Sequence, residues 1–163
     1  DEAADPELNA NGYDTLEFLF SANRGEDPRP LTRVISGGEL SRLMLAIKCV
    51  LADRDTVETY VFDEVDAGVG GRAADKIGLK LKQVAKSHQT IAITHLAPVA
   101  AYAQQHFFVG KSNHGGRAQS QVRCLETEAR TDEIARMIDG ASVTSDSKKV
   151  AKEMLKRAVK SLG

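Results

Sequence analysis

Three short polar clusters stand out in this chain because each one adjoins an apolar segment. They are Ser36-Gly37-Gly38-Glu39, Asp63-Glu64 and His95. Adjacent carboxylates can hold a divalent cation or activate a water molecule. A histidine titrates near neutral pH and can transfer a proton. The three clusters are therefore candidates for one catalytic site, provided that the fold brings them together.

The first cluster begins a predicted helix. Apolar residues after it recur every three or four positions, which predicts an amphipathic helix from about residue 38 to 52. Ser36 then occupies the N-cap position, and Glu39 follows at the spacing of a capping box. Alternatively, the glycine pair lets an anion such as phosphate approach unpaired N–H groups at the helix start. On these residues alone capping is favoured, because S-x-x-E is a common spacing.

The other two clusters follow predicted strands. Apolar runs at 59–62 and 90–94 end at Asp63-Glu64 and at His95. Their lack of alternation predicts strands covered on both faces, as in a parallel sheet, with a helix over 72–86 between them. Ligands of such sheets bind at the carboxyl ends of strands, so we expect both clusters at one edge. An acidic surface turn and a structural histidine remain the alternatives.

The remaining chain carries weaker signals. Alternation over 15–22 predicts another strand, and two strands around a glycine turn between 107 and 125 predict a β-hairpin. The Gly110-Lys111-Ser112 sequence resembles the end of a phosphate-binding P-loop. Gln105 replaces the first glycine of that motif and no helix follows, so a P-loop is not expected.

Two helices are predicted at the carboxyl end of the chain. Thr131 is expected to cap the first, which ends before Gly140. The second covers 146–160, and its expected buried side consists of Val150, Met154, Ala158 and Val159. The rest of that helix is rich in lysine. Such a face is usually solvated, and the alternative is contact with the DNA backbone.

Composition limits the classes of partner and the location. The 22 Lys and Arg nearly cancel the 23 Asp and Glu, so contact with nucleic acid or membrane requires a local patch. Neither a signal peptide nor a membrane-spanning run is present, which predicts a cytoplasmic protein. The acidic stretch 1–12 is expected to be a linker. The chain starts at Asp1 instead of Met, which suggests a fragment or a processed product.

The order and spacing of the three clusters resemble the C-terminal half of an ABC-type ATPase head. The strings VISGGELSR (34–42), FDEVDAGVGG (62–71) and THLAPVA (94–100) are similar to the RecN family, bacterial DNA-repair relatives of the SMC proteins. The resemblance begins near Asp14. It implies an α/β fold of the P-loop NTPase type, with parallel strands, flanking helices and a C-terminal β-hairpin. Residues 1–12 would then be the remnant of a coiled-coil connection, and 13–163 the C-terminal lobe.

The resemblance implies a role for each cluster in Mg²⁺-dependent hydrolysis of ATP during double-strand-break repair and recombination. Asp63 would hold Mg²⁺ through water, Glu64 would orient the attacking water, and His95 would contact the γ-phosphate. The signature motif contacts ATP bound to a partner head, and it would consist of Ser36, Gly37, Gly38 and Glu39. Gly70 stands where many ABC ATPases carry an aspartate, which leaves the contacts of that loop open.

The Walker A sequence that cradles the phosphates is absent from these 163 residues. The resemblance therefore implies three partners: an N-terminal lobe that carries Walker A, a second head in a homodimer, and DNA. It implies no membrane partner and a nucleoid-associated place in the cytoplasm. Alone, the chain is expected to be inactive. Two alternatives are a metal-dependent nuclease that uses Asp63, Glu64 and Asp66, and a lobe that only dimerises.

Overall fold

The computed structural model describes residues 12–13, 16–21, 25–31, 36–52, 54–114 and 117–161. The chain divides into two compact units, Asp1–Ser36 and Gly37–Gly163, and each is described by itself. The predicted linker 1–12 lies almost wholly outside the described residues.

The N-terminal unit contains a two-stranded antiparallel sheet. Strand β1 (Leu19–Phe20) pairs with β2 (Arg29–Pro30), and Leu19 lies opposite Pro30. The strand predicted over 15–22 is therefore shorter than expected. Beyond Pro30 the pairing continues by one hydrogen bond, from the Leu31 N–H to the Phe18 carbonyl at 3.0 Å.

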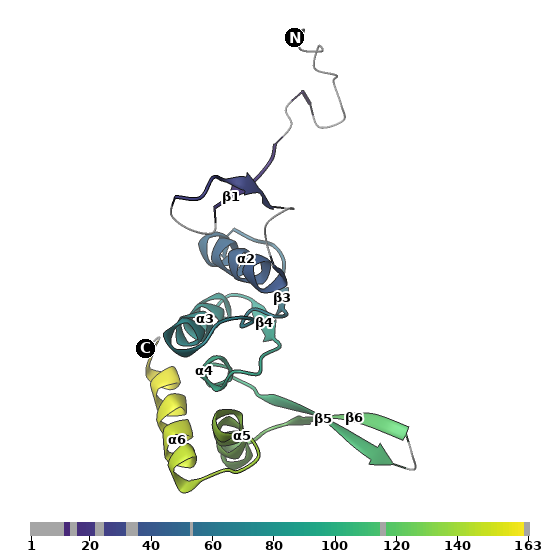
Figure 1. Cartoon of the computed structure of the whole chain (residues 1–163), viewed down its shortest axis with the longest axis vertical. Coiled ribbons are helices and arrows are strands. Elements are labelled where there is room, and N and C mark those ends of the chain that lie inside the picture. Colours follow the sequence, from purple (N-terminus) through teal and green to yellow (C-terminus); the bar gives the residue numbers. More distant parts are fainter. Residues whose placement is uncertain are drawn as a thin grey trace. The chain divides into compact units, whose positions relative to one another are not determined.

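The C-terminal unit begins with a helix, which is followed by a strand, a second helix and a second strand (Figure 1). Helix α2 (Gly37–Leu51) leads to β3 (Thr59–Phe62), then α3 (Gly71–Val84) and β4 (Gln89–Ala92). The short helix α4 (Ala97–Ala100) follows. A hairpin of β5 (Phe107–His114) and β6 (Arg117–Cys124) precedes α5 (Thr127–Asp139) and α6 (Ser145–Lys160). The α/β class, the parallel pair, the flanking helices and the C-terminal hairpin are confirmed.

Strands β3 and β4 are buried on one face only. Tyr60 and Phe62 point into a core made with α2, α3 and α4. On the opposite face Val61 is 64% exposed, and Ile91, its partner in the register, is 47% exposed. The prediction that both faces are covered is wrong for this chain. Among the described residues, helices α2, α3 and α4 cover only the face that carries Tyr60 and Phe62. An apolar run in the sequence does not reveal whether the second face of a strand is also covered.

A second core lies between α4, α5 and α6. Its buried members are mostly small or branched side chains: Ala97, Ala100, Ala101, Tyr102, Ile134, Ala135, Ala151 and Ala158. Helix α5 begins at Thr127, four residues before the predicted cap, so the assignment of Thr131 as N-cap is wrong. Thr131 is buried within the helix, where its hydroxyl donates to the Thr127 carbonyl at 2.9 Å.

Helix α6 matches its predicted range, but its buried face is rotated. Thr144 and Ser147 form a reciprocal capping box at its start. Ala151 and Ala158 are buried, whereas Val150 is 42% and Val159 77% exposed, contrary to the expectation for the two valines. Small residues let the helix approach its neighbours closely, and this close packing decides which face turns inward.

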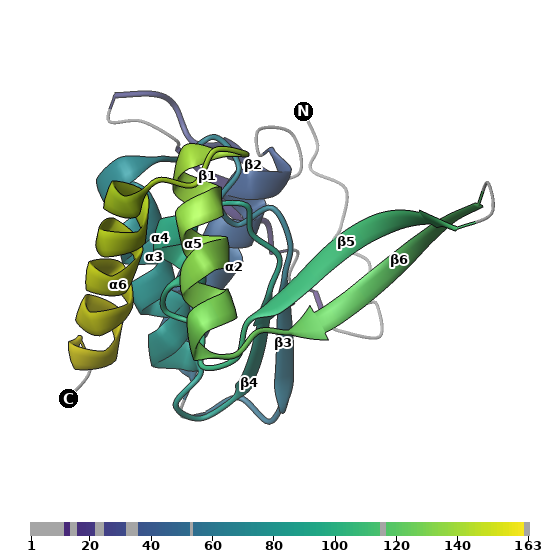
Figure 2. The ribbon, with the colours of Figure 1, turned by 90° about the horizontal axis from the view of Figure 1, so that it is seen from below.

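The hairpin projects from the helices of the unit, as Figure 2 shows. All eight residues of β5 pair with β6, and Lys111 lies opposite Ser120. The Gly110-Lys111-Ser112 sequence is therefore strand, and the prediction that it is not a P-loop is confirmed. Within the described part of the chain, the helices are all too short or too polar to cross a bilayer.

Candidate active site at the carboxyl ends of β3 and β4

The two strand-end clusters lie at one edge of the parallel pair, as the sequence predicted. Strands β3 and β4 run parallel, and Phe62 pairs with Ala92 at their carboxyl ends. Asp63 and Glu64 follow Phe62 directly, while His95 lies three residues beyond Ala92. The Ile93 N–H donates to the Phe62 carbonyl at 3.0 Å and continues the pairing toward the site.

Asp63 and Glu64 form a tight, exposed turn. The Asp63 carboxylate accepts the Glu64 N–H at 2.9 Å, and the Glu64 carbonyl accepts the Ala67 N–H at 2.9 Å. Glu64 has φ 55°, and among the described residues it alone, apart from glycines, has positive φ. Such a conformation costs free energy in any residue with a Cβ, and it is concentrated at functional sites. The strain at Glu64 therefore marks this turn as a candidate catalytic element.

The glycine pair lies against this turn. A Cβ placed on Gly37 would lie 2.5 Å from Glu64 Oε2, and one on Gly38 would lie 3.1 Å from the Glu64 carbonyl oxygen. From the next turn of α2, Arg42 Nη1 donates to the Ala67 carbonyl at 2.8 Å. Gly38 thus has a packing role, because a side chain there would meet the backbone of the Glu64 turn, whereas the atom nearest to Gly37 is the end of the flexible Glu64 side chain. This role leaves the capping and phosphate interpretations both open.

The outer residues of the first cluster are placed less directly. Ser36 precedes α2 and is the last residue of the N-terminal unit, and Glu39 lies in the first turn of α2. The negative charge of Glu39 is favourable there because the amino end of a helix is electropositive.

Asp66 is a residue whose position the sequence argument missed. Its side chain is 3% exposed, and its Oδ2 accepts hydrogen bonds from the Thr94 hydroxyl and, at 3.1 Å, from the His95 N–H. His95 Nδ1 lies 3.5 Å from the same oxygen, while the His95 side chain is 77% exposed. Asp66 therefore joins the loop after β3 to the loop after β4. Its place between the apolar residues Val65 and Ala67 was the available signal, because an acid buried among apolar residues needs partners.

The hydroxyl of Thr94 serves both sides of this junction. It donates to Asp66 and accepts the Leu96 N–H at 3.0 Å. The backbone on both sides of His95 is thus held by hydrogen bonds, and the imidazole remains open to a ligand. This arrangement suits a histidine that contacts a bound group instead of packing in a core.

The carboxylates do not form a metal cluster by themselves. Among the residues that the structure describes, no group of three or more His, Cys, Asp or Glu side chains is arranged to hold a metal ion. Asp66 turns its carboxylate toward Thr94 and His95. A nuclease site built from Asp63, Glu64 and Asp66 is therefore disfavoured. Asp63 has an exposed carboxylate, the donor type that Mg²⁺ prefers, and it fits a role as one ligand among several.

Curated relatives of this chain share one name, DNA repair protein RecN. RecN of Bacillus subtilis strain 168 is 44% identical over 152 residues, which are 93% of this chain and 26% of that protein. RecN of Mycobacterium leprae is 47% identical over 151 residues, 93% of this chain and 25% of that protein. This chain is homologous to RecN. The relative from Halalkalibacterium halodurans, 45% identical over 145 residues, is also named DNA repair protein RecN.

The RecN relatives are about four times as long as this chain. The chain spans about a quarter of the length of the RecN proteins that it matches. No family model matches the chain. One solved structure comes from work on ATP-driven dimerization and DNA-stimulated activation of SMC ATPases. Its alignment covers 72% of this chain and 70% of the solved chain, with 24% sequence identity and a TM-score of 0.48.

Proposed function

We propose that this chain is the C-terminal lobe of an ATP-hydrolysing head that acts in DNA double-strand-break repair and recombination. The observation that carries the proposal is the parallel pairing of β3 with β4, with Asp63-Glu64 and His95 at the same edge. RecN homology supports the role in DNA repair. Residues 1–12 would connect to a coiled coil and 13–163 would form the lobe.

Each cluster then has a chemical role in phosphoryl transfer, which depends on positioning and on stabilisation of charge. Glu64 orients the attacking water, and His95 contacts the γ-phosphate with its exposed ring. Asp63 would hold Mg²⁺ through water, and the ion would supply positive charge near the phosphate oxygens. The lysine and glycine-rich loop that cradle the phosphates come from an N-terminal lobe. Without that lobe the chain is inactive.

The first cluster acts across an interface. Ser36, Gly37, Gly38 and Glu39 contact ATP that is held by a second head, so the active unit is a homodimer of heads. The backbone N–H groups at the start of α2 are suited to an anion because the helix dipole favours negative charge there. In the free lobe, Glu64 Oε2 lies beside Gly37 at this helix start. The γ-phosphate of the ATP held by the partner head can therefore bind at the start of α2 only if the Glu64 side chain turns away from Gly37.

The decisive experiment joins this chain to the N-terminal lobe and measures ATP hydrolysis with Mg²⁺. Glu64→Gln is expected to abolish turnover while nucleotide still binds, because it removes the group that orients water. Glu128→Gln, which changes an exposed glutamate on α5, is the matched control and should keep full activity. Full turnover by Glu64→Gln would overturn the assignment.

The role across the interface has its own test. ATP-dependent dimerisation of the joined head should be lost in Ser36→Arg, because a large cation replaces a small group that faces the partner's nucleotide. Unchanged dimerisation would contradict the signature role. A lobe that only dimerises predicts a third pattern: dimers form with ATP, and both Glu64→Gln and His95→Ala leave repair in cells intact.

A further inference from the structure

Positive charge is concentrated on α3 and α6. These two helices contain ten Lys and Arg against three Asp and Glu, although the whole chain has a formal net charge of −1. They also contact each other. Arg157 Nη2 on α6 lies 3.0 Å from Asp75 Oδ1 on α3, and the Lys82 ammonium on α3 donates to the Ala158 carbonyl on α6. The excess charge therefore belongs to one joined pair of helices.

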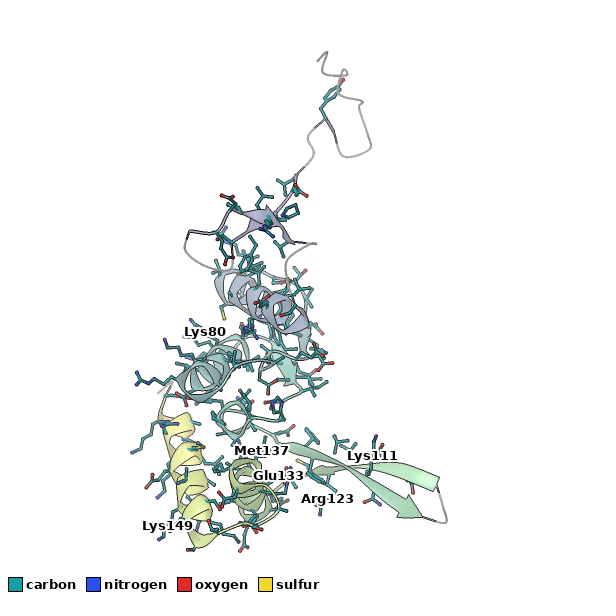
Figure 3. The ribbon with its side chains drawn as sticks, in the orientation of Figure 1. Lys80, Lys111, Arg123, Glu133, Met137 and Lys149 are labelled. Atoms are coloured by element: carbon teal, nitrogen blue, oxygen red, sulfur yellow. The ribbon has the colours of Figure 1, made fainter. Side chains whose placement is uncertain are left out.

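Six of these basic residues form two rows with a spacing of four residues. Residues at this spacing share one face of a helix. The row on α3 is Arg72, Lys76 and Lys80, and the row on α6 is Lys152, Lys156 and Lys160. All six side chains are exposed. Nitrogen-tipped side chains project from both helices on the side away from the hairpin, where Lys80 and Lys149 are labelled (Figure 3).

The rows differ from the basic residues that support the fold. Lys148 pairs with Asp132, Lys149 with Asp146, and Arg157 with Asp75. In the part of the chain that the structure describes, no ion pair involves any member of the two rows. Acids thus pair with two cations at helix contacts, Lys148 and Arg157, and with Lys149 within α6, and these ion pairs leave the two rows uncompensated.

Stability of the helices does not explain the rows. Like charges four residues apart destabilise a helix by about 0.2–0.5 kcal/mol per pair. The dipole at the carboxyl end of α6 favours cations in the last turn, which accounts for Lys160 but not for Lys152. A solvated face explains exposure but not the excess of ten Lys and Arg over three Asp and Glu on these two helices. A polyanionic partner explains both the exposure and the sign.

We propose that the two rows bind the phosphate backbone of DNA without reading its sequence. The choice of DNA as the polyanion rests on the proposed function in DNA repair. Lys side chains supply point charges suited to phosphates, whereas reading of bases depends on bidentate Arg, Asn or Gln contacts in a groove. The contact is therefore electrostatic, and its affinity falls steeply with salt.

The test measures binding of the 163-residue chain to a fluorescein-labelled random-sequence duplex by anisotropy, without nucleotide, between about 50 and 200 mM NaCl. Lys152→Gln/Lys156→Gln/Lys160→Gln removes the α6 row and retains helix propensity. The slope of log affinity against log salt should become shallower by about 2.7, because each lost phosphate contact contributes about 0.9. Arg72→Gln/Lys76→Gln/Lys80→Gln should have a similar effect.

The matched control removes the same number of charges elsewhere. Arg54→Gln/Lys111→Gln/Arg123→Gln neutralises three exposed cations outside α3 and α6 and should leave the slope unchanged. An equal decrease of the slope in this control would overturn the proposal, since DNA would then be attracted by the overall charge of the chain and not by the two rows. Absence of DNA binding by the wild-type chain, or equal competition by poly-glutamate at the same charge concentration, would also overturn it.

The readout separates this inference from the proposed function. ATP hydrolysis is measured in the joined head, and the row variants should retain its DNA-independent rate. If the row variants keep the wild-type salt slope while Glu64→Gln loses turnover, the DNA-binding proposal is wrong and the ATPase assignment stands. If the row variants have a shallower salt slope while Glu64→Gln keeps full turnover, the ATPase assignment is wrong and the DNA-binding proposal stands.

Discussion

The Asp66 carboxylate holds His95 by its backbone. Asp66 Oδ2 accepts the His95 N–H at 3.1 Å and lies 3.5 Å from His95 Nδ1. The Asp66 side chain is 3% exposed and the His95 side chain 77%, so a buried anchor fixes the position of an open ring. Asp66 is therefore a positioning residue for the candidate γ-phosphate contact.

Asp66→Ala is expected to lower the turnover number of the joined head by about 100-fold, the typical effect of misplacing a group by about 1 Å. ATP binding should change little, because Walker A supplies most of it. Asp66→Asn retains an acceptor and should recover part of the rate. Wild-type turnover in Asp66→Ala would contradict the positioning role, and an unchanged thermal unfolding profile would exclude loss of fold as the cause of a reduced rate.

Gly38→Ala is expected to destabilise the chain by about 1–3 kcal/mol, the usual cost of overpacking. The added Cβ would lie 2.9 Å from the Ala67 Cβ and 3.1 Å from the Glu64 carbonyl oxygen, and the backbone oxygen cannot move easily. Gly70→Ala is the control, since its Cβ meets open space and its φ of −156° is extended backbone. Denaturant unfolding measures both variants. Equal midpoints for the two would show that α2 does not pack closely on the turn.

Glu64→Asn is expected to raise the free energy of unfolding by about 0.5–1 kcal/mol while abolishing hydrolysis, because Asn tolerates the left-handed region better than Glu. Glu64→Gln has the same lost charge but no such tolerance, so its stability should match the wild type. The strain at φ 55° would then be a cost that the native residue bears for function. If both variants change stability equally, charge and not backbone strain is responsible.

His106 is expected to weaken the fold in acid. Burial lowers the pKa of His106, and the nearby Arg130 charge lowers it further. Its Nδ1 is buried without a hydrogen-bond partner among the described residues. The unfolded chain therefore binds a proton more readily than the folded one, so stability decreases as pH falls below about 6.5, the unfolded pKa. His106→Gln should reduce this dependence in unfolding curves measured at several pH values, and parallel curves would refute it.

Much of the local structure could be predicted from the sequence because it depends on neighbours along the chain. The periodicity after Gly37 predicted α2, and the apolar runs before Asp63 and His95 predicted β3 and β4. Parallel pairing followed from the helix between them. The hairpin and the rejection of a P-loop at Lys111 also followed from short-range patterns.

The predictions that were wrong concern sequence patterns that fit two local structures equally well. Thr131 is as good a cap as it is a buried helical residue, and the early start of α5 is decided by packing of Ile134 and Ala135 against α4 and α6. The exposed valines of α6 have the same cause, because burial of Ala151 fixes the rotation of the helix. Periodicity identifies a helix but leaves its partner unspecified.

By itself, the sequence determined which residues are available for chemistry and that two clusters end neighbouring strands. Only the tertiary structure decided that Asp66 anchors His95, that Gly38 packs against the Glu64 turn, and that one face of β3 stays open. The physical reason is distance along the chain. Asp66 and Thr94 are 28 positions apart, and contacts of this kind depend on how whole elements pack and not on the identity of adjacent residues.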